Sequence, residues 1–172
     1  MSVENEHRLR FRDAMASLSA AVNIITTDGP AGRCGMTATA VCSVTDTPPT
    51  LMVCINRNSA MNPVFQENGN LCVNILNHEQ ELMARHFAGM TGVSMEDRFK
   101  WNIWNTGVLG QPQLQETLAN LEGRIEQVQE VGTHYVYLVE IKQIIVQEKG
   151  HGLIYFKRGF HPVMDENMAI TA

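Results

Sequence analysis

Apolar and hydroxyl-bearing residues alternate along residues 34–45. Successive side chains of a β-strand point to opposite faces, so this alternation predicts one strand with a buried face and an exposed face. We expect Met36, Ala38, Ala40, Cys42 and Val44 in the core, and Thr37, Thr39, Ser43 and Thr45 on the exposed face. No Lys, Arg or Glu stands among these residues, although exposed strands usually carry them. The short side chains suggest that another group lies against this face.

Similar patterns predict further strands at residues 20–27, 50–56, 71–76, 118–129, 133–146 and 152–160. A turn at Asp28-Gly29-Pro30 returns the first of them, and prolines at 48 and 49 separate the next two. The long strand at 118–129 is expected to expose Glu122 on its polar face. About seven strands without strict strand–helix alternation predict a mainly β fold, an antiparallel β-barrel with short helices at its ends.

Three short helices complete the prediction. Residues 9–18 carry Phe11, Met15 and Leu18 at helical spacing, which indicates an amphipathic helix packed on the body of the protein. A second helix is expected to begin at Ser59 as N-cap and to end at Gly69. In the third, Asn77 precedes Gln80 by three residues, the spacing of a capping box. Residues 89–111 show no clear pattern, which is typical of a functional lid or of missed elements.

Composition narrows the function classes. The chain has 172 residues, 44% apolar and 18% charged, which is ordinary for a single soluble domain spanning residues 1–172. It has no apolar run of membrane-spanning length and no signal-like N-terminus, so a cytoplasmic protein without a membrane partner is expected. A net charge of −5 disfavours nucleic acid as a partner.

The cysteines and histidines do not predict a metal site. The four cysteines include no C-x-x-C pair and stand in apolar runs, so buried free thiols are expected at Cys34, Cys42, Cys54 and Cys72. The six histidines are dispersed and lack ligand spacing. Phosphate-loop, serine-hydrolase and zinc-protease motifs are absent as well.

Three features could still bind a ligand, and each has a purely structural alternative. The hydroxyl face of residues 37–45 equally suits the β-propensity of threonine. The junction at residues 56–60 places the start of a helix where it could hold a phosphate, or it is an ordinary strand–helix connection. His134 stands at a strand end, where a lone histidine is more often structural. All three features lie at strand ends.

Taken together, four blocks resemble the flavin reductase family, which is built on the FMN-binding split barrel, a Greek-key antiparallel β-barrel. They are "GMTATAVCSVTDTPPTLMVCINRNSAMNPVF", "LCVNILNHEQELMARHFAG", "GTHYVYLVEI" and "LIYFKRGFHPV", and they occur in the family's order. The resemblance covers the chain from about Arg8 to Met164. The resemblance implies a homodimer that transfers hydride from NADH, or NADPH, to free FMN or FAD. The reduced flavin would then reach a separate monooxygenase that acts on an aromatic substrate.

The resemblance also implies which residues contact the cofactors. No catalytic side chain and no metal ligand are expected, and His134 would position the nicotinamide. Expected cofactor contacts are Thr37, Ala38, Thr39, Ala40, Ser43, Asn56, Ser59, Ala60, Asn74, Arg85, Phe87, His134, Arg158 and Phe160. The chain departs from the family at two positions. Thr133 stands where an acidic residue is frequent, and Phe160 where tyrosine is frequent, so neither a charge nor a phenol is available there.

The chemistry fits these residue types. Hydride transfer between nicotinamide and flavin is carried out by the cofactors, so the protein has to bind and align them. Short side chains let a backbone approach a flat ring closely. Reversible binding is expected, because the chain has no dedicated phosphate loop. The alternatives are a flavin-binding or storage protein without turnover, and a relative of pyridoxamine-phosphate oxidase, whose basic phosphate clamp is not evident here.

Overall fold

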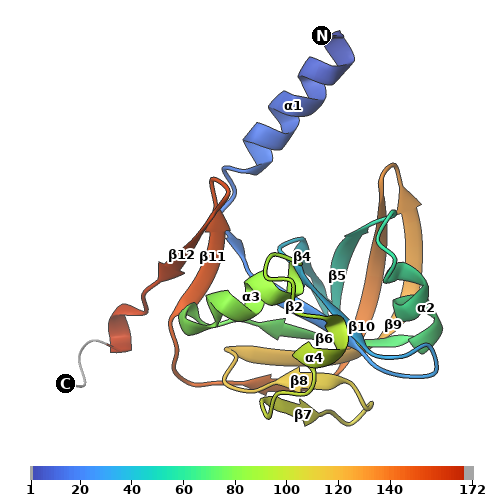
Figure 1. The fold of residues 1–172 in the computed structure, drawn as a ribbon, viewed down its shortest axis with the longest axis vertical. Coiled ribbons are helices and arrows are strands. Elements are labelled where there is room, and N and C mark those ends of the chain that lie inside the picture. The colour runs from blue at the N-terminus through green and yellow to red at the C-terminus, as the bar shows by residue number, and fades with distance from the viewer. Residues whose placement is uncertain (1, 169–172) are drawn as a thin grey trace.

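The computed structural model describes residues 2–168, which form a mainly antiparallel β fold with short helices (Figure 1). The strands are β1 (Ala20–Ala21), β2 (Asn23–Thr27), β3 (Cys34–Ala38), β4 (Val41–Asp46), β5 (Pro49–Asn56), β6 (Asn70–Ile75), β7 (Trp104–Thr106), β8 (Pro112–Leu114), β9 (Ala119–Val131), β10 (His134–Val146), β11 (Gly152–Phe156) and β12 (Gly159–Val163). The helices are α1 (Val3–Met15), α2 (Asn62–Asn68), α3 (Glu81–Phe87) and α4 (Met95–Arg98), with 3-10 turns η1 (His78–Gln80) and η2 (Glu166–Met168). Within the described residues, no helix combines the length and the apolar character needed to span a bilayer.

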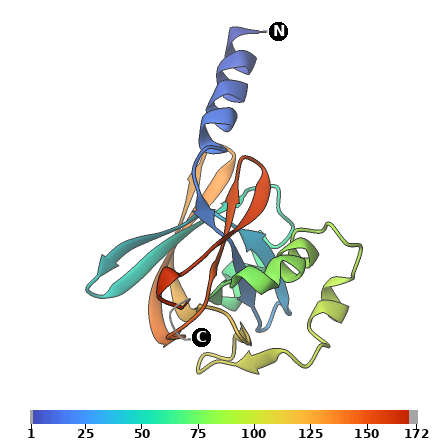
Figure 2. The same ribbon diagram turned by 90° about the vertical axis from the view of Figure 1, so that its left-hand side faces the viewer.

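Seven strands form one sheet in the order β3-β2-β6-β9-β10-β5-β4, and neighbouring strands are antiparallel. β3 and β4 are its two edges, although only Thr39 and Ala40 separate them along the chain. Such a link spans about 11 Å at most, so the sheet has to curl until the end of β3 lies near the start of β4. Figure 2 shows the curled sheet from the side. The expected antiparallel split-barrel architecture is confirmed. The barrel stays open at Thr39–Ala40, here called the seam, because no ladder joins β3 to β4 in residues 2–168.

The alternating stretch at residues 34–45 is therefore two strands and not one. At the seam the Val41 N–H donates to the Thr39 carbonyl at 2.9 Å, and this tight turn shifts the phase of the alternation. Val41 consequently packs against the core. The prediction was right for Met36 and Ala38, which precede the turn, and wrong for Ala40 in the turn and for Cys42 and Val44 after it. Those three, Ala40, Cys42 and Val44, are exposed.

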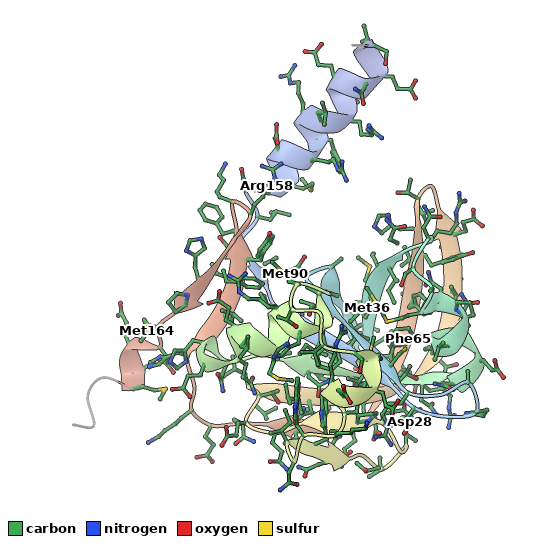
Figure 3. The ribbon with its side chains drawn as sticks, viewed as in Figure 1. Asp28, Met36, Phe65, Met90, Arg158 and Met164 are labelled. Atoms are coloured by element: carbon green, nitrogen blue, oxygen red, sulfur yellow. The ribbon has the colours of Figure 1, made fainter. Side chains whose placement is uncertain are left out.

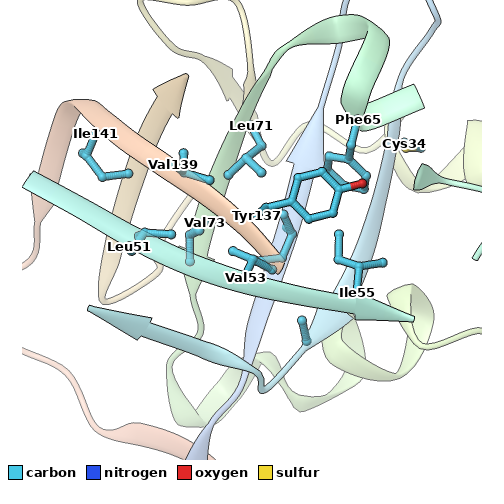
Figure 4. Close-up of a cluster of buried hydrophobic side chains, with 12 residues drawn as sticks. Cys34, Leu51, Val53, Ile55, Phe65, Leu71, Val73, Tyr137, Val139 and Ile141 are labelled. Carbon is cyan, nitrogen blue, oxygen red and sulfur yellow. The ribbon is translucent and has the colours of Figure 1, made fainter. Parts of the chain in front are cut away.

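The interior contains two apolar clusters. The larger lies inside the curled sheet and includes Phe65 and Tyr137, whose rings contact edge to face (Figure 4). β5 shows why the sheet forms there, because Leu51, Val53 and Ile55 alternate into this cluster. The second cluster lies beside β2 and α3, where Phe87 contacts the rings of Phe99 and Trp104 with centroid separations of 5.4 and 5.7 Å.

The three expected helices are present, with differences in bounds, capping and packing. The first was expected at residues 9–18 and is α1 at Val3–Met15, so Leu18 lies beyond its end. Gly69 ends α2 in a left-handed conformation, and Asn77 with Gln80 forms the predicted capping box. The N-cap of α2 is Met61 and not Ser59, whose hydroxyl accepts from the Met61 N–H in the preceding turn. α1 has no buried residue and leads away from the body, so its expected packing on the body was wrong (Figures 1 and 2).

Two further segments differ from the prediction. The strand expected at 152–160 is the hairpin β11–β12, because Lys157 and Arg158 adopt left-handed conformations and reverse the chain. Glu122 is fully buried and not exposed as expected. Its carboxylate accepts the backbone N–H groups of Leu109 and Gln111, each at 2.9 Å. This buried carboxylate holds the end of the segment at residues 89–111, which also contains α4 and β7.

All four cysteines are free thiols, and their burial differs. Cys34 and Cys72 are buried as expected, whereas Cys54 is half-buried and Cys42 is exposed. Burial raises the pKa of the Cys34 thiol to about 11. Among residues 2–168 no three His, Cys, Asp or Glu side chains gather as metal ligands would.

Candidate functional site

The sequence-predicted residues Thr37, Ala38 and Thr39 line a hollow of about 210 Å³ beside the seam. Phe160 of β12 lines the same hollow, so these four residues lie together. Val22, Ala88, Met90 and Tyr155 complete the lining, and Met90 is labelled in Figure 3. β3 is an edge strand, so part of its backbone has no partner strand and can pair with the polar edge of a flat ligand. The wall is mostly apolar, as small-molecule sites usually are.

α3 fixes one wall of this hollow. The Thr37 hydroxyl donates to the Ala84 carbonyl at 2.7 Å, so this side chain is turned toward α3. Arg85 lies over the ring of Phe160, with 5.0 Å from the guanidinium carbon to the ring centroid, and pairs with Glu81 one turn earlier. A cation beside an apolar wall suits a ligand that has a flat ring and an anionic group.

A second, larger hollow of about 640 Å³ adjoins the first. Thr39 and Tyr155 line both hollows, and the second also contains Arg158 and the C-terminal half of α1. The reversal at Lys157 and Arg158 places Arg158 there, where its guanidinium donates to Asp13 at 2.6 Å. Arg158 and Phe160 therefore lie on the same side of the seam as Thr37.

The junction residues form a second group at the ends of β5 and β10. His134 is paired directly with Asn56 across the two strands, and the Arg57 N–H donates to the Thr133 carbonyl at 2.9 Å. The His134 Nδ1 lies 2.9 Å from the Thr133 hydroxyl, which orients the exposed imidazole. Ser59 and Ala60 follow on the same turn, where Ser59 is half-buried and Ala60 is exposed.

Buried hydrogen bonds make this turn rigid. The amide of Asn62 donates to the carbonyls of Asn56, Arg57 and Ser59 at 2.8 to 3.3 Å. The hydroxyl of the buried Tyr137 donates to the amide oxygen of Asn62 at 2.7 Å. The turn is thereby anchored to the main core.

The seam connects the two groups. The Cys54 N–H donates to the Ala40 carbonyl at 3.0 Å, and Asn56 follows Cys54 by two residues on β5. The chain therefore runs from the hollow at Thr37, through Ala40, to the turn at Asn56. One ligand with a ring and a polar tail would meet both groups along this path.

Three expected contact residues lie elsewhere. Asn74 is fully buried, and its amide is used by five hydrogen bonds, with Ile24, Thr26, Cys72, Leu114 and Asn120. The Phe87 ring is only 2% exposed and packs in the second cluster. Ser43 pairs with Leu51 on the β4–β5 hairpin, away from both groups. None of the three side chains lines either hollow.

Val22, Ala88, Met90 and Tyr155 line the smaller hollow but were not expected from the sequence, and Tyr155 is the aromatic one among them. It stands on β11 and contacts the Phe160 ring edge to face at a centroid separation of 5.1 Å. Its 36% exposure is high for an aromatic ring between two hollows. The alternation of residues 152–156 indicates a strand that carries Tyr155. Which surface Tyr155 faces depends on where the β11–β12 hairpin turns, and the sequence did not show that position.

The chain is similar to known proteins over most of its length. The model of the flavin reductase like domain matches residues 15–164. The 4-hydroxyphenylacetate 3-monooxygenase reductase component of Escherichia coli is 75% identical over 94% of this chain and 95% of that protein. FMN reductase (NADH) RutF of Enterobacter cloacae is 54% identical over 90% of this chain and 93% of its own.

Solved structures agree with the fold. The NADH:FAD oxidoreductase SgcE6 of Streptomyces globisporus C-1027, in complex with NAD and FAD fragments, superposes with a TM-score of 0.85 at 25% identity. The match covers 96% of this chain and 98% of that chain. The sequence blocks, the open antiparallel barrel and these similarities agree, and the chain belongs to the flavin reductase family.

Proposed function

We propose that this protein is the reductase component of a two-component 4-hydroxyphenylacetate 3-monooxygenase. It transfers hydride from NADH to free FMN or FAD and releases the reduced flavin to a separate oxygenase. The observation that carries the proposal is the 75% identity, over nearly the whole chain, to a protein of that name. The site is compatible with it, because it offers a mostly apolar wall and an edge strand.

The residues at the seam would hold the flavin. Thr37, Ala38 and Thr39 present short side chains, so the ring could lie close to the β3 backbone. Arg85 supports the Phe160 ring on the opposite wall. The turn at residues 56–60 would take the polar tail, because its backbone is held rigid by Asn62. A flavin bound there supplies the hydride acceptor, and the protein aligns the two rings.

His134 would orient the nicotinamide. Its ring is exposed, and its Nδ1 is engaged by Thr133, which leaves Nε2 available for a carboxamide. No side chain has to move a proton during this step, since hydride passes between the cofactors. The protein's contribution is proximity, which can lower a barrier by about 7–11 kcal/mol.

We further propose reversible flavin binding, a homodimer and a cytoplasmic location. The hollows are open and no phosphate loop encloses a tail, which supports a flavin that leaves after each turnover. Gel filtration tests this point. A stoichiometric yellow flavin that remains bound through prolonged dialysis would contradict reversible binding.

A steady-state assay tests the function. NADH oxidation is followed with catalytic amounts of protein and excess FMN or FAD, first without and then with the oxygenase and 4-hydroxyphenylacetate. We expect many turnovers per protein and hydroxylated product only with the oxygenase. A flavin spectrum without turnover would show a binding module instead. Repeating the assay with NADPH, and with FMN against FAD, determines the cofactor preference.

A further inference from the structure

The outer face of the sheet at β4, β5 and β10 is apolar where an exposed antiparallel sheet is normally polar. Cys42, Met52, Cys54, Val136 and Leu138 form this outer face, and cross-strand pairing joins Cys42 to Met52, Met52 to Leu138 and Cys54 to Val136. The alternate residues of the same strands fill the core. On the next strand the paired positions are Gln127 and Gln129, which are polar as expected for a solvated sheet. The patch is thus local and is typical of a covered surface.

α1 is a second unpartnered apolar surface. Phe11 and Met15, four residues apart on the helix, and Leu18, three residues beyond its end, are here called the stripe, and they are 61%, 45% and 59% exposed. The helix carries a serine N-cap at Ser2 and a regular last turn, although no tertiary contact buries any of its residues. Short isolated helices are marginal in water, so packing against another surface would explain its regularity.

α1 cannot reach its own outer face. Its last turn is tied to the β11–β12 hairpin by three hydrogen bonds. They join the Lys157 N–H to the Ala16 carbonyl at 2.8 Å, the Lys157 ammonium to the Ser17 hydroxyl at 2.6 Å, and Arg158 to Asp13 at 2.6 Å. Both views show the helix leading away from the sheet (Figures 1 and 2). If an α1 helix covers this outer face, that helix has to belong to another molecule.

We propose that α1 is an exchanged arm: its stripe packs on the outer face of a second copy, and the second copy's arm packs on the first. The inference rests on the homodimer in the proposed function and goes beyond it by assigning both surfaces. A second copy supplies both complementary surfaces in one symmetric contact. Thirteen helical residues extend about 20 Å, enough to cross three strands that together span about 10 Å.

The exchange would place the partner's arm beside the functional site. Asn56 and His134 continue the outer face directly, as the pair after Cys54 and Val136 on β5 and β10. The second, larger hollow, which Phe11, Met15 and Thr39 line, would likewise be bounded by the second copy.

Crosslinking in the full-length protein tests the surfaces. In Phe11→Cys, a short bismaleimide is expected to join the arm thiol to the native thiol at Cys42 or Cys54 of a second copy, giving a two-chain band on a denaturing gel. The band should disappear in Phe11→Cys/Cys42→Ser/Cys54→Ser. Val108→Cys is the matched control, because Val108 is 68% exposed and lies outside both surfaces. A band that survives loss of both native thiols, or that is absent from Phe11→Cys, would overturn the proposal.

Sedimentation equilibrium gives an independent readout without cofactors. Wild type and Val108→Glu should sediment as dimers, with twice the mass of one chain. Phe11→Glu should give a lower mass, down to that of one chain, and circular dichroism should confirm that it is folded. Unchanged mass for Phe11→Glu would refute the exchange, and a simultaneous loss of transfer to the oxygenase would assign the stripe to that partner instead. NADH oxidation, measured separately, reports on the proposed function, so the two ideas can fail independently.

Discussion

The guanidinium carbon of Arg85 lies 5.0 Å from the centroid of the Phe160 ring, joining α3 to β12 across the wall of the smaller hollow. Exposed cation–π contacts contribute about 0.5–1 kcal/mol. Arg85→Met keeps an apolar contact and removes the charge, so the KM for flavin should rise about two- to fivefold. Steady-state kinetics at saturating NADH measures this. Arg124→Met, an exposed substitution on β9, should change nothing, and equal effects in both variants would contradict a local role for Arg85.

His134 should affect NADH more than flavin. Removing one hydrogen bond to a ligand costs about 0.5–1.5 kcal/mol, so His134→Ala should raise the KM for NADH up to about tenfold. The dissociation constant for oxidised flavin, measured by fluorescence quenching, should stay nearly constant. Thr133→Val frees the imidazole from its hydroxyl partner and should give a smaller effect of the same kind. Equal losses of NADH and flavin binding in a folded His134→Ala variant would remove His134 from the nicotinamide site.

Gly35 should resist even the smallest side chain. A Cβ at this position would lie 2.9 Å from the Phe87 ring and 3.2 Å from the Ile25 carbonyl. Gly35→Ala is therefore expected to destabilise the protein by about 1–3 kcal/mol, which urea denaturation measures. Gly152→Ala is the control, since its Cβ would meet Val163 at an ordinary 3.5 Å. Similar losses in both variants would show that strand glycines are costly for reasons other than this contact.

Glu122 should be needed for stability and not for catalysis. Its buried carboxylate accepts two backbone N–H groups, and a glutamine can accept only one while turning its NH₂ toward the other. Glu122→Gln should cost about 1–3 kcal/mol in the free energy of unfolding. Glu126→Gln, exposed on the same strand, should cost almost nothing. A Glu122→Gln variant with wild-type stability would mean that the loop at residues 107–111 is held by other contacts.

The strands were largely predictable from the sequence, because alternation records which side chains are buried. β5 follows this rule from Leu51 to Ile55. The rule failed at the seam, where a turn between Thr39 and Val41 shifts the phase without any Gly or Pro to mark it. It failed again at Lys157 and Arg158, because two long basic residues do not signal a left-handed turn.

The candidate site was predictable only in part. The face of Thr37 and Thr39 and the ring of Phe160 do come together, but the sequence could not show that the Asn74 amide is used up inside the sheet. Burial of Glu122 was unpredictable for a related reason, since its partners are backbone groups of a loop. The amphipathic pattern of α1 correctly indicated a helix, but it could not say what covers its apolar side.

The seam also determines where the barrel can open locally. Within residues 2–168, spreading β3 from β4 breaks no ladder between them, whereas separating any other neighbours in the seven-stranded sheet breaks a row of backbone hydrogen bonds. Low-energy opening motions should therefore concentrate at Thr39 and Ala40, and amide hydrogen exchange should be fastest there within the sheet. A flat ligand bound at the seam would hold the two edges in place until it dissociates. Hydrogen exchange at these two amides would therefore report ligand binding and release.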